Sequence, residues 1–178
     1  MKLKAIIVIF ISILALHCTK PPEYPSQPQI DFKQISVSDT TDILGNLHSL
    51  YVIAFKILDG DGDFGFKPED TLDNSSNFNN FIIDIFIKKN NLVTQITNDT
   101  ITYNGKIPWV KPVGLNTFYK STVLFNLDIY FLNFDSIQFK FYVLDRAKNQ
   151  SNTETTSWIA KNFRGTLYDS IDLIPEEN

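Results

Sequence analysis

The sequence of 178 residues contains only one cysteine, two histidines and seven glycines. One cysteine cannot form a disulfide within the chain, which excludes a disulfide-stapled mini-protein. Basic residues are not in excess, because 16 lysines and arginines face 20 acidic residues, and this disfavours a nucleic-acid binder. The low glycine content and an aromatic content of 13% disfavour a linker or a disordered chain. The length suits one domain whose core is large enough to be stable alone.

The chain also lacks the residue patterns of common enzyme classes. No G-x-S-x-G, G-x-G-x-x-G or P-loop pattern occurs. His17 belongs to the N-terminal segment, and His48 alone cannot form a zinc site with several histidines. A glycosidase with two catalytic carboxylates is not excluded, because aspartates are plentiful. The closest group of carboxylates, however, has a spacing that suits metal binding rather than a sugar ring. We therefore expect no catalytic activity.

The N-terminus has the pattern of an export signal. Lys2 and Lys4 flank the start of an apolar run over residues 5–16. The run has the length of a signal-peptide core and is too short for a membrane-spanning helix, which needs about 20 residues. A lone cysteine follows at Cys18, which is similar to the lipidated cysteine of bacterial lipoproteins. His17 stands where such signals usually have a small residue, so a cleaved, fully secreted protein is the alternative.

A proline-rich segment follows the signal. Four prolines between Pro21 and Pro28 predict a stiff, extended tether. Such a tether would hold a folded domain away from a membrane. Together with Cys18 it predicts a cell-envelope protein that a lipid anchors to the outer membrane. The sequence divides into a signal peptide over residues 1–17, a tether over 18–28, a folded domain over 29–162, and a C-terminal tail or extra edge strand over 163–178.

Alternation of apolar and polar residues predicts strands along the rest of the chain. The clearest case is residues 137–143, where every second residue from Ile137 to Val143 is apolar. Tight turns are expected at Lys89-Asn90-Asn91 and at Asn104-Gly105, because asparagine and glycine tolerate positive φ. The other predicted strands are residues 30–37, 51–57, 81–87, 92–96, 100–103, 123–129 and 155–160.

About seven to eight short strands without a long helical pattern predict an all-β fold, an antiparallel immunoglobulin-like β-sandwich. A small β-barrel is the alternative. The Cys–Trp–Cys signature of antibody domains is absent, so the prediction depends on the strand pattern alone.

An acidic loop, Asp59-Gly60-Asp61-Gly62-Asp63-Phe64-Gly65, directly follows a predicted strand. Its alternating carboxylates repel one another unless a cation lies among them, and Ca²⁺ takes about six to eight oxygens, mostly from carboxylates and carbonyls. The glycines let the backbone curl around such an ion. Asp70 falls where an EF-hand has its bidentate glutamate, but Phe64 replaces the EF-hand glycine and a strand precedes the loop. A calcium loop between strands fits better, and a solvated acidic turn is the alternative.

A second acidic element follows the predicted strand over residues 137–143. In a Greek-key sandwich the second and sixth strands run in the same direction, which would bring Asp59 and Asp145 to the same end. Asp145 would then be a further metal ligand or would hold the loop through Arg146. Alternatively, Asp145 and Asn149 cap an ordinary turn.

Trp109 is a candidate for ligand binding because it lies in a proline-flanked loop between Pro108 and Pro112. An exposed indole at such a place would stack on a sugar or anchor a protein partner. More often a tryptophan there folds back over the core. The chain is therefore expected to be a calcium-stabilised binding or assembly module, with a carbohydrate-binding accessory domain of a surface glycan-uptake system as the alternative.

The acidic loop and a later motif carry a resemblance to a known family. A strand ending in D-G-D-G-D and followed by Phe64-Gly65 resembles a family of uncharacterised Bacteroidota-type lipoproteins. The segment D-R-A-x-N-x-S-N over residues 145–152 is similar to their last hairpin and to bacterial immunoglobulin-like domains generally. The resemblance covers the signal, the tether and most of residues 29–160. It implies a lipid-anchored β-sandwich but no activity, because a fold does not supply one.

Overall fold

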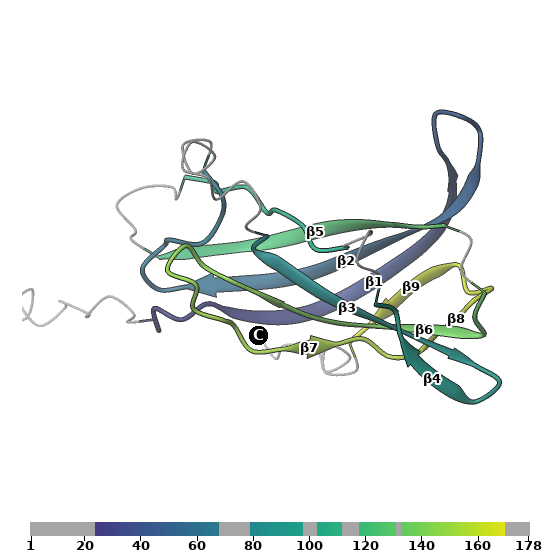
Figure 1. Ribbon diagram of the computed structural model, residues 1–178. Helices are drawn as coiled ribbons and strands as arrows, with labels where there is room; N and C mark the ends of the chain where they lie inside the picture. Colours follow the sequence, from purple (N-terminus) through teal and green to yellow (C-terminus); the bar gives the residue numbers. More distant parts are fainter. Residues whose placement is uncertain (1–23, 68–78, 98–102, 112–117, 131–132, 170–178) are drawn as a thin grey trace, which may run out of the picture.

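The computed structural model describes residues 24–67, 79–97, 103–111, 118–130 and 133–169 (Figure 1). These residues form nine strands and contain no helix, hence none that is long and apolar enough to cross a membrane. The strands are β1 (Gln29–Thr41), β2 (Leu47–Asp59), β3 (Phe81–Lys89), β4 (Leu92–Gln95), β5 (Tyr119–Ile129), β6 (Ser136–Val143), β7 (Glu154–Thr155), β8 (Ile159–Ala160) and β9 (Gly165–Tyr168).

The strands form two layers that pack face to face (Figure 1). One sheet has the order β5-β2-β1-β9, and the other has the order β4-β3-β6-β7, with β8 also paired to β6. All of these strand pairs are antiparallel. The placement of β2 beside β5 and of β3 beside β6 is the arrangement of an immunoglobulin-type sandwich. The predicted antiparallel β-sandwich is confirmed, and the closed barrel is wrong.

The predicted single strand over residues 155–160 is wrong, because two short strands, β7 and β8, replace it. Between them the backbone N–H of Phe139 donates to the Thr156 hydroxyl at 3.1 Å, and the N–H of Thr156 donates to the carbonyl of Phe139 at 2.9 Å. The side chain of Thr156 thus takes the place of a backbone acceptor and interrupts the regular ladder. After β8, the chain crosses to the other sheet, where β9 pairs with β1.

The two predicted turns have different outcomes. Asn90 and Asn91 have φ values of 49° and 64° and form the tight β3–β4 turn, as predicted. Asn104-Gly105 is not a positive-φ hairpin turn, so this prediction is wrong. Instead, Gly105 exchanges two backbone hydrogen bonds with Phe81, at 2.9 and 3.0 Å. A Cβ atom at Gly105 would lie 2.4 Å from the ring of Phe125, so glycine is needed there for close packing.

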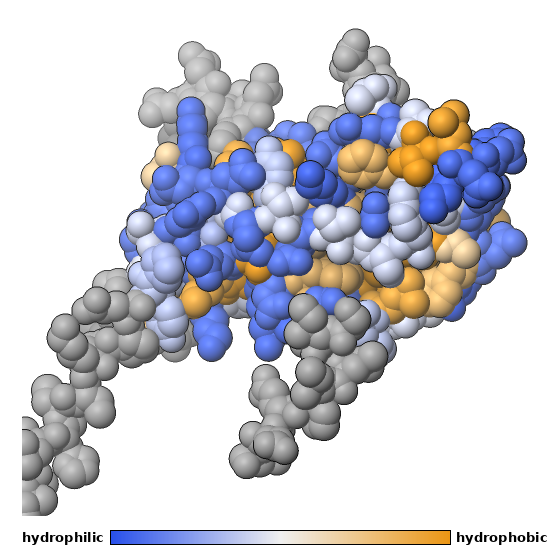
Figure 2. Space-filling view, turned by 90° about the horizontal axis from the view of Figure 1, so that it is seen from below, coloured by the Kyte–Doolittle hydropathy of each residue, from blue (hydrophilic) through white to orange (hydrophobic). Residues whose placement is uncertain are grey.

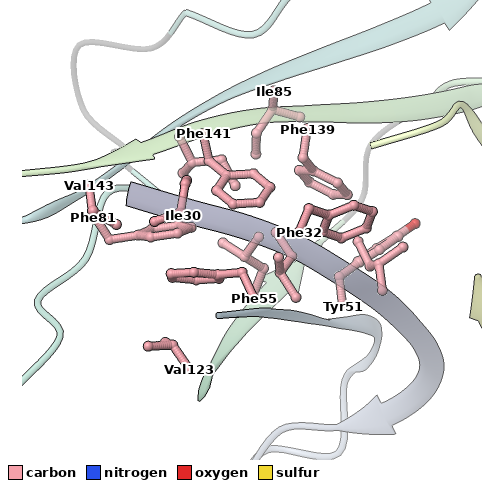
Figure 3. Close-up of a cluster of buried hydrophobic side chains, with 14 of the residues drawn as sticks. Ile30, Phe32, Tyr51, Phe55, Phe81, Ile85, Val123, Phe139, Phe141 and Val143 are labelled. Atoms are coloured by element: carbon pink, nitrogen blue, oxygen red, sulfur yellow. The ribbon is translucent and has the colours of Figure 1, made fainter. Parts of the chain in front are cut away.

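The core lies between the sheets and contains a cluster of aromatic side chains (Figure 3). The ring of Phe141 lies 5.5 Å from that of Phe55, 5.6 Å from that of Phe81 and 6.1 Å from that of Phe32. Each such pair contributes about 0.5–1.5 kcal/mol beyond the burial of its area. The cluster fixes β2, which carries Phe55, against β6, which carries Phe141. The acidic loop follows β2, and the turn that contains Asp145 follows β6.

Candidate metal centre

Asp59 is the last residue of β2 and is completely buried, with 0% exposure. It continues the inward-facing alternation of Phe55 and Ile57, so a carboxylate occupies a position that faces the core. Its Oδ2 accepts a hydrogen bond from the backbone N–H of Phe64 at 2.9 Å. Its Oδ1 is buried and has no hydrogen-bond partner among the described residues. A buried carboxylate oxygen without a partner is strongly unfavourable, which makes this atom a candidate ligand for a cation.

Asp61 and Asp63 lie beside Asp59. One carboxylate oxygen from each of the three residues lies within 4.8 Å of the other two. Oxygens that share one Ca²⁺ ion, each at about 2.3–2.6 Å, lie at most about 5 Å apart, so the spacing fits a common ion. Asp61 is exposed, whereas Asp63 is half-buried and its Oδ1 also has no hydrogen-bond partner among the described residues.

The local sequence explains why the loop curls. Gly62 and Gly65 have φ values of 69° and 99°, in the left-handed region that favours glycine. Between these glycines Phe64 is fully buried and its ring lies 5.5 Å from that of Tyr119 on β5. The aromatic residue that breaks the EF-hand pattern therefore anchors the loop to the core.

Burial and mutual repulsion raise the pKa values of two carboxyl groups in this loop. Burial is the main cause that raises the pKa of Asp59 to about 6, and the charges of Asp61, Asp63 and Asp145 add to it, while the Phe64 N–H opposes it. The pKa of Asp63 is raised to about 6, again mainly by burial and then by the neighbouring aspartates. At neutral pH both groups are ionised in an environment that disfavours their charge, and a cation would relieve this.

Asp145 lies at the same end of the sandwich, since its charge raises the pKa values of Asp59 and Asp63. Asp145 is buried, and its two oxygens accept hydrogen bonds from the backbone N–H and the side-chain amide of Asn149, at 2.7 and 2.8 Å. These bonds are those of a capped turn. The group of described residues that could hold a metal ion contains the three loop aspartates and not Asp145.

The turn at Asp145 nevertheless supports the acidic loop. The backbone N–H of Ala147 donates to Oδ2 of Asp63 at 3.2 Å. The positive charge of Arg146 lowers the pKa of Asp63, which partly opposes the effect of burial. The predicted link between the two loops through Arg146 is therefore electrostatic, and the Ala147 N–H supplies the hydrogen bond.

The acidic loop also holds the start of the described chain, a contact that sequence reasoning missed. The backbone N–H of Gly60 donates to the carbonyl of Pro25 at 2.8 Å. A Cβ atom at Gly60 would lie 2.3 Å from the carbonyl oxygen of Tyr24 and 2.5 Å from that of Pro25. The ring of Tyr24 packs against that of Phe118, with centroids 4.9 Å apart. Only the choice of glycine at position 60 signalled this close approach.

The remaining predicted site residues are not part of this cluster. Cys18 and Asp70 lie outside the described residues. Trp109 is half-buried, and its backbone N–H donates to the carbonyl of Phe66 at 2.8 Å. The ammonium group of Lys67 lies 4.7 Å from the centroid of the indole ring. Trp109 thus packs against the chain that follows the acidic loop, and the carbohydrate-binding alternative stays a prediction.

No protein-family model, curated protein or solved structure matches this chain. The lipoprotein resemblance therefore stays a prediction from residues 1–28 and the two motifs. Because a β-sandwich serves many unrelated functions, any functional conclusion depends on the residues of the site itself.

Proposed function

We propose that the protein is a lipid-anchored cell-envelope module whose β-sandwich binds Ca²⁺ in the loop after β2 and serves in binding or assembly. The observation that carries the cation site is Oδ1 of Asp59, which is fully buried and has no hydrogen-bond partner among the described residues. Asp61 and Asp63 lie within reach of the same ion. The anchor on Cys18 and the outer-membrane location derive from the N-terminal sequence pattern.

The ligand types favour Ca²⁺ over other common metal ions. The three candidate side chains offer only carboxylate oxygens, which suit hard cations such as Ca²⁺ and Mg²⁺. Zinc sites use mostly cysteine and histidine, and neither occurs in this cluster. Ca²⁺ tolerates irregular geometry and a varying number of oxygens, whereas Mg²⁺ demands a near-octahedral arrangement. The exposed Asp61 leaves one side of the loop open, so water molecules would complete the coordination of a Ca²⁺ ion.

Millimolar Ca²⁺ is expected to raise the melting temperature of the protein, and Asp61→Ala is expected to abolish this shift. At a Ca²⁺ concentration of 100 times Kd, the stabilisation is about 2.7 kcal/mol, which corresponds to roughly 5–10 °C for a chain of this size. Scanning calorimetry with Ca²⁺, Mg²⁺ or EDTA measures the effect. Because Asp61 is exposed, its replacement should change the melting temperature in EDTA only slightly.

Asp84→Ala is the matched control, because this carboxylate bonds to Gln95 on the outside of the β3–β4 pair and lies outside the cluster. Ca²⁺ should raise the melting temperature of this control variant as much as that of the unsubstituted protein. Identical melting of the unsubstituted protein in Ca²⁺ and in EDTA would contradict the cation site.

In EDTA, the stability of the protein is expected to fall as the pH rises from about 4 to about 7. Asp59 has a folded-state pKa of about 6, above the ordinary value of 3.8. The folded state therefore holds a proton that the unfolded state releases, and the stability that this proton supplies is lost as pH rises through 6. The loss from Asp59 is at most about 3 kcal/mol.

Urea unfolding at several pH values, with EDTA or with Ca²⁺, tests this expectation. Ca²⁺ should remove the loss above pH 6, since the ion neutralises the carboxylate without a proton. Asp59→Asn keeps an oxygen acceptor for the Phe64 N–H but carries no charge, so it should flatten the EDTA profile. Parallel profiles for Asp59→Asn and the unsubstituted protein would show that Asp59 is not the responsible group.

A further inference from the structure

The hairpin between β1 and β2 projects beyond the body of the sandwich (Figure 1). These strands pair up to Thr41 and Leu47, whereas β9 reaches only to Val37 and β5 only to Ser49. The last residues of the hairpin therefore form a two-stranded ribbon without a further strand beside it in the described chain.

The tip of this ribbon is apolar and rigid. Ile43, Leu44 and Leu47 are 101%, 81% and 65% exposed. Side-chain Oδ1 of Asp42 accepts hydrogen bonds from the backbone N–H groups of Leu44 and Asn46, each at 2.9 Å. Isolated exposed aliphatic residues are ordinary, but three within five positions on a fixed turn form a preorganised contact surface. Such a surface loses little conformational entropy on binding.

A shallow groove of about 450 Å³ lies near the other end of the same sheet. It is lined mainly by apolar atoms, to which the half-buried Leu58 contributes, whereas the side chains of Ile30 and Ile57 are buried. Three charged residues, Lys56, Lys120 and Asp31, are among its lining residues. Ile57 faces the core and is buried, so by alternation Lys56 and Leu58 face outward. The groove therefore opens on the outer face of the sheet. Figure 2, which views the molecule from below, shows apolar and polar side chains intermixed, with more apolar residues in the right half of this face.

The tip is negatively charged, whereas the groove lining has a net positive charge, because Asp31 in the groove is paired with Lys33 at 2.9 Å and two further lysines line it. Residues 38–47 contain Asp39 and Asp42 but no lysine or arginine. Asp39 is paired with Arg164 at 2.6 Å, while hydrogen bonds across the turn hold the pKa of Asp42 below its usual value and keep it ionised. Within the described chain, Lys56 and Lys120 at the groove form no ion pair.

A chain cannot place its own tip in its own groove. The groove includes Ile30 and the tip includes Ile43, both on or next to the extended strand β1, so they lie about 40 Å apart at about 3.3 Å per residue. We propose that the hairpin tip of one copy docks into the groove of a second copy. The contact is heterologous and joins copies head to tail.

This proposal names a partner for the assembly role proposed above, but its test does not depend on the Ca²⁺ site, so either can fail alone. The small apolar tip places the contact among weak, transient interfaces. Attachment of many copies to one membrane would raise their effective concentration and favour such a contact. The absence of basic residues at the tip disfavours an anionic lipid surface as its occupant, because membrane-binding segments are usually rich in lysine and arginine.

Sedimentation velocity from micromolar to millimolar protein tests the proposal, at one fixed Ca²⁺ concentration. The unsubstituted protein should gain average mass with concentration. The tip variant Ile43→Asp/Leu44→Asp and the groove variant Lys56→Glu/Lys120→Glu should each stay monomeric. Both pairs of residues are exposed, and the turn uses only the backbone of Leu44, so folding should be preserved.

The decisive arm mixes the two variants. The tip variant keeps an intact groove and the groove variant keeps an intact tip, so their mixture should reach twice the monomer mass and no more. Leu92→Asp/Val93→Asp removes exposed apolar residues from β4 instead, and this control should associate like the unsubstituted protein.

Several outcomes would overturn the proposal. These are a monomeric unsubstituted protein at millimolar concentration, a mixture that stays monomeric, and a β4 control that loses association as fully as the tip variant. Binding of the unsubstituted protein, but not of the tip variant, to phosphatidylcholine or phosphatidylglycerol vesicles without self-association would assign the tip to a membrane instead.

Discussion

Phe141→Ala is expected to lower the free energy of unfolding by about 3–5 kcal/mol. The side chain is 0% exposed, and its ring contacts aromatic rings from both sheets. Phe32 and Phe55 belong to β1 and β2 of one sheet, while Phe81 lies beside Phe141 in the other. Truncation to alanine removes these contacts and leaves a cavity that the two rigid sheets cannot close. The loss therefore combines the hydrophobic free energy of the removed ring atoms with the cost of the cavity that remains.

Urea unfolding at equilibrium measures this loss. Tyr142→Ala is the matched control, because Tyr142 is the next residue of β6 and its side chain lies on the opposite, outer face. Its replacement should cost far less than that of Phe141. Domains are stable by about 5–15 kcal/mol in total, so Phe141→Leu provides a milder variant if alanine prevents folding. Equal losses for Phe141→Ala and Tyr142→Ala would contradict the assignment of Phe141 to the core.

The position of Phe141 could be predicted because a strand with one buried face shows its burial in the sequence. The alternation over residues 137–143 predicted β6, and the inward residues are those that the structure buries. The division of residues 155–160 into β7 and β8 could not be predicted in this way. It depends on a hydrogen bond between Phe139 and the hydroxyl of Thr156, two residues that are far apart in the sequence.

The candidate metal site was likewise predictable only in part. The acidic loop was evident from its spacing, but the burial of Asp59 was not predicted, because the strand was expected to end at residue 57. In the structure β2 continues to Asp59, and the alternation of Phe55 and Ile57 then turns Asp59 inward. The role of Asp145 was left open between ligand and turn cap, because the local sequence suits both. The structure directs its oxygens to Asn149, four residues later.

Glycine positions show a further limit of sequence reasoning. A glycine permits either positive φ or close packing, and the local sequence does not say which is used. Gly105 is required for its contact with the ring of Phe125 rather than for a turn, which is why the turn prediction at Asn104-Gly105 is wrong. Gly65 requires both properties, because its φ is 99° and a Cβ atom there would lie 2.5 Å from the Cα atom of Trp109.

Gly65→Ala is therefore expected to lower the free energy of unfolding by about 2–5 kcal/mol, since a left-handed conformation and an overlap with backbone act together. The added methyl group would also lie 2.8 Å from the nitrogen of Trp109 and 3.0 Å from the carbonyl oxygen of Pro108. These atoms belong to the main chain, so no change of side-chain rotamer relieves the overlap. The segment paired with Phe66 must move away instead.

Gly45→Ala separates the cost of the left-handed conformation from the cost of the overlap with the backbone. Gly45 has a φ of 83° at the tip of the β1–β2 hairpin, and a Cβ atom there would meet nothing within 4 Å. This variant should lose only the conformational part, about 1–2 kcal/mol. Urea unfolding of both variants gives the difference that belongs to the contact between Gly65 and Trp109. Equal losses would show that this contact is looser than the structure indicates, because the conformational strain alone would then explain both variants.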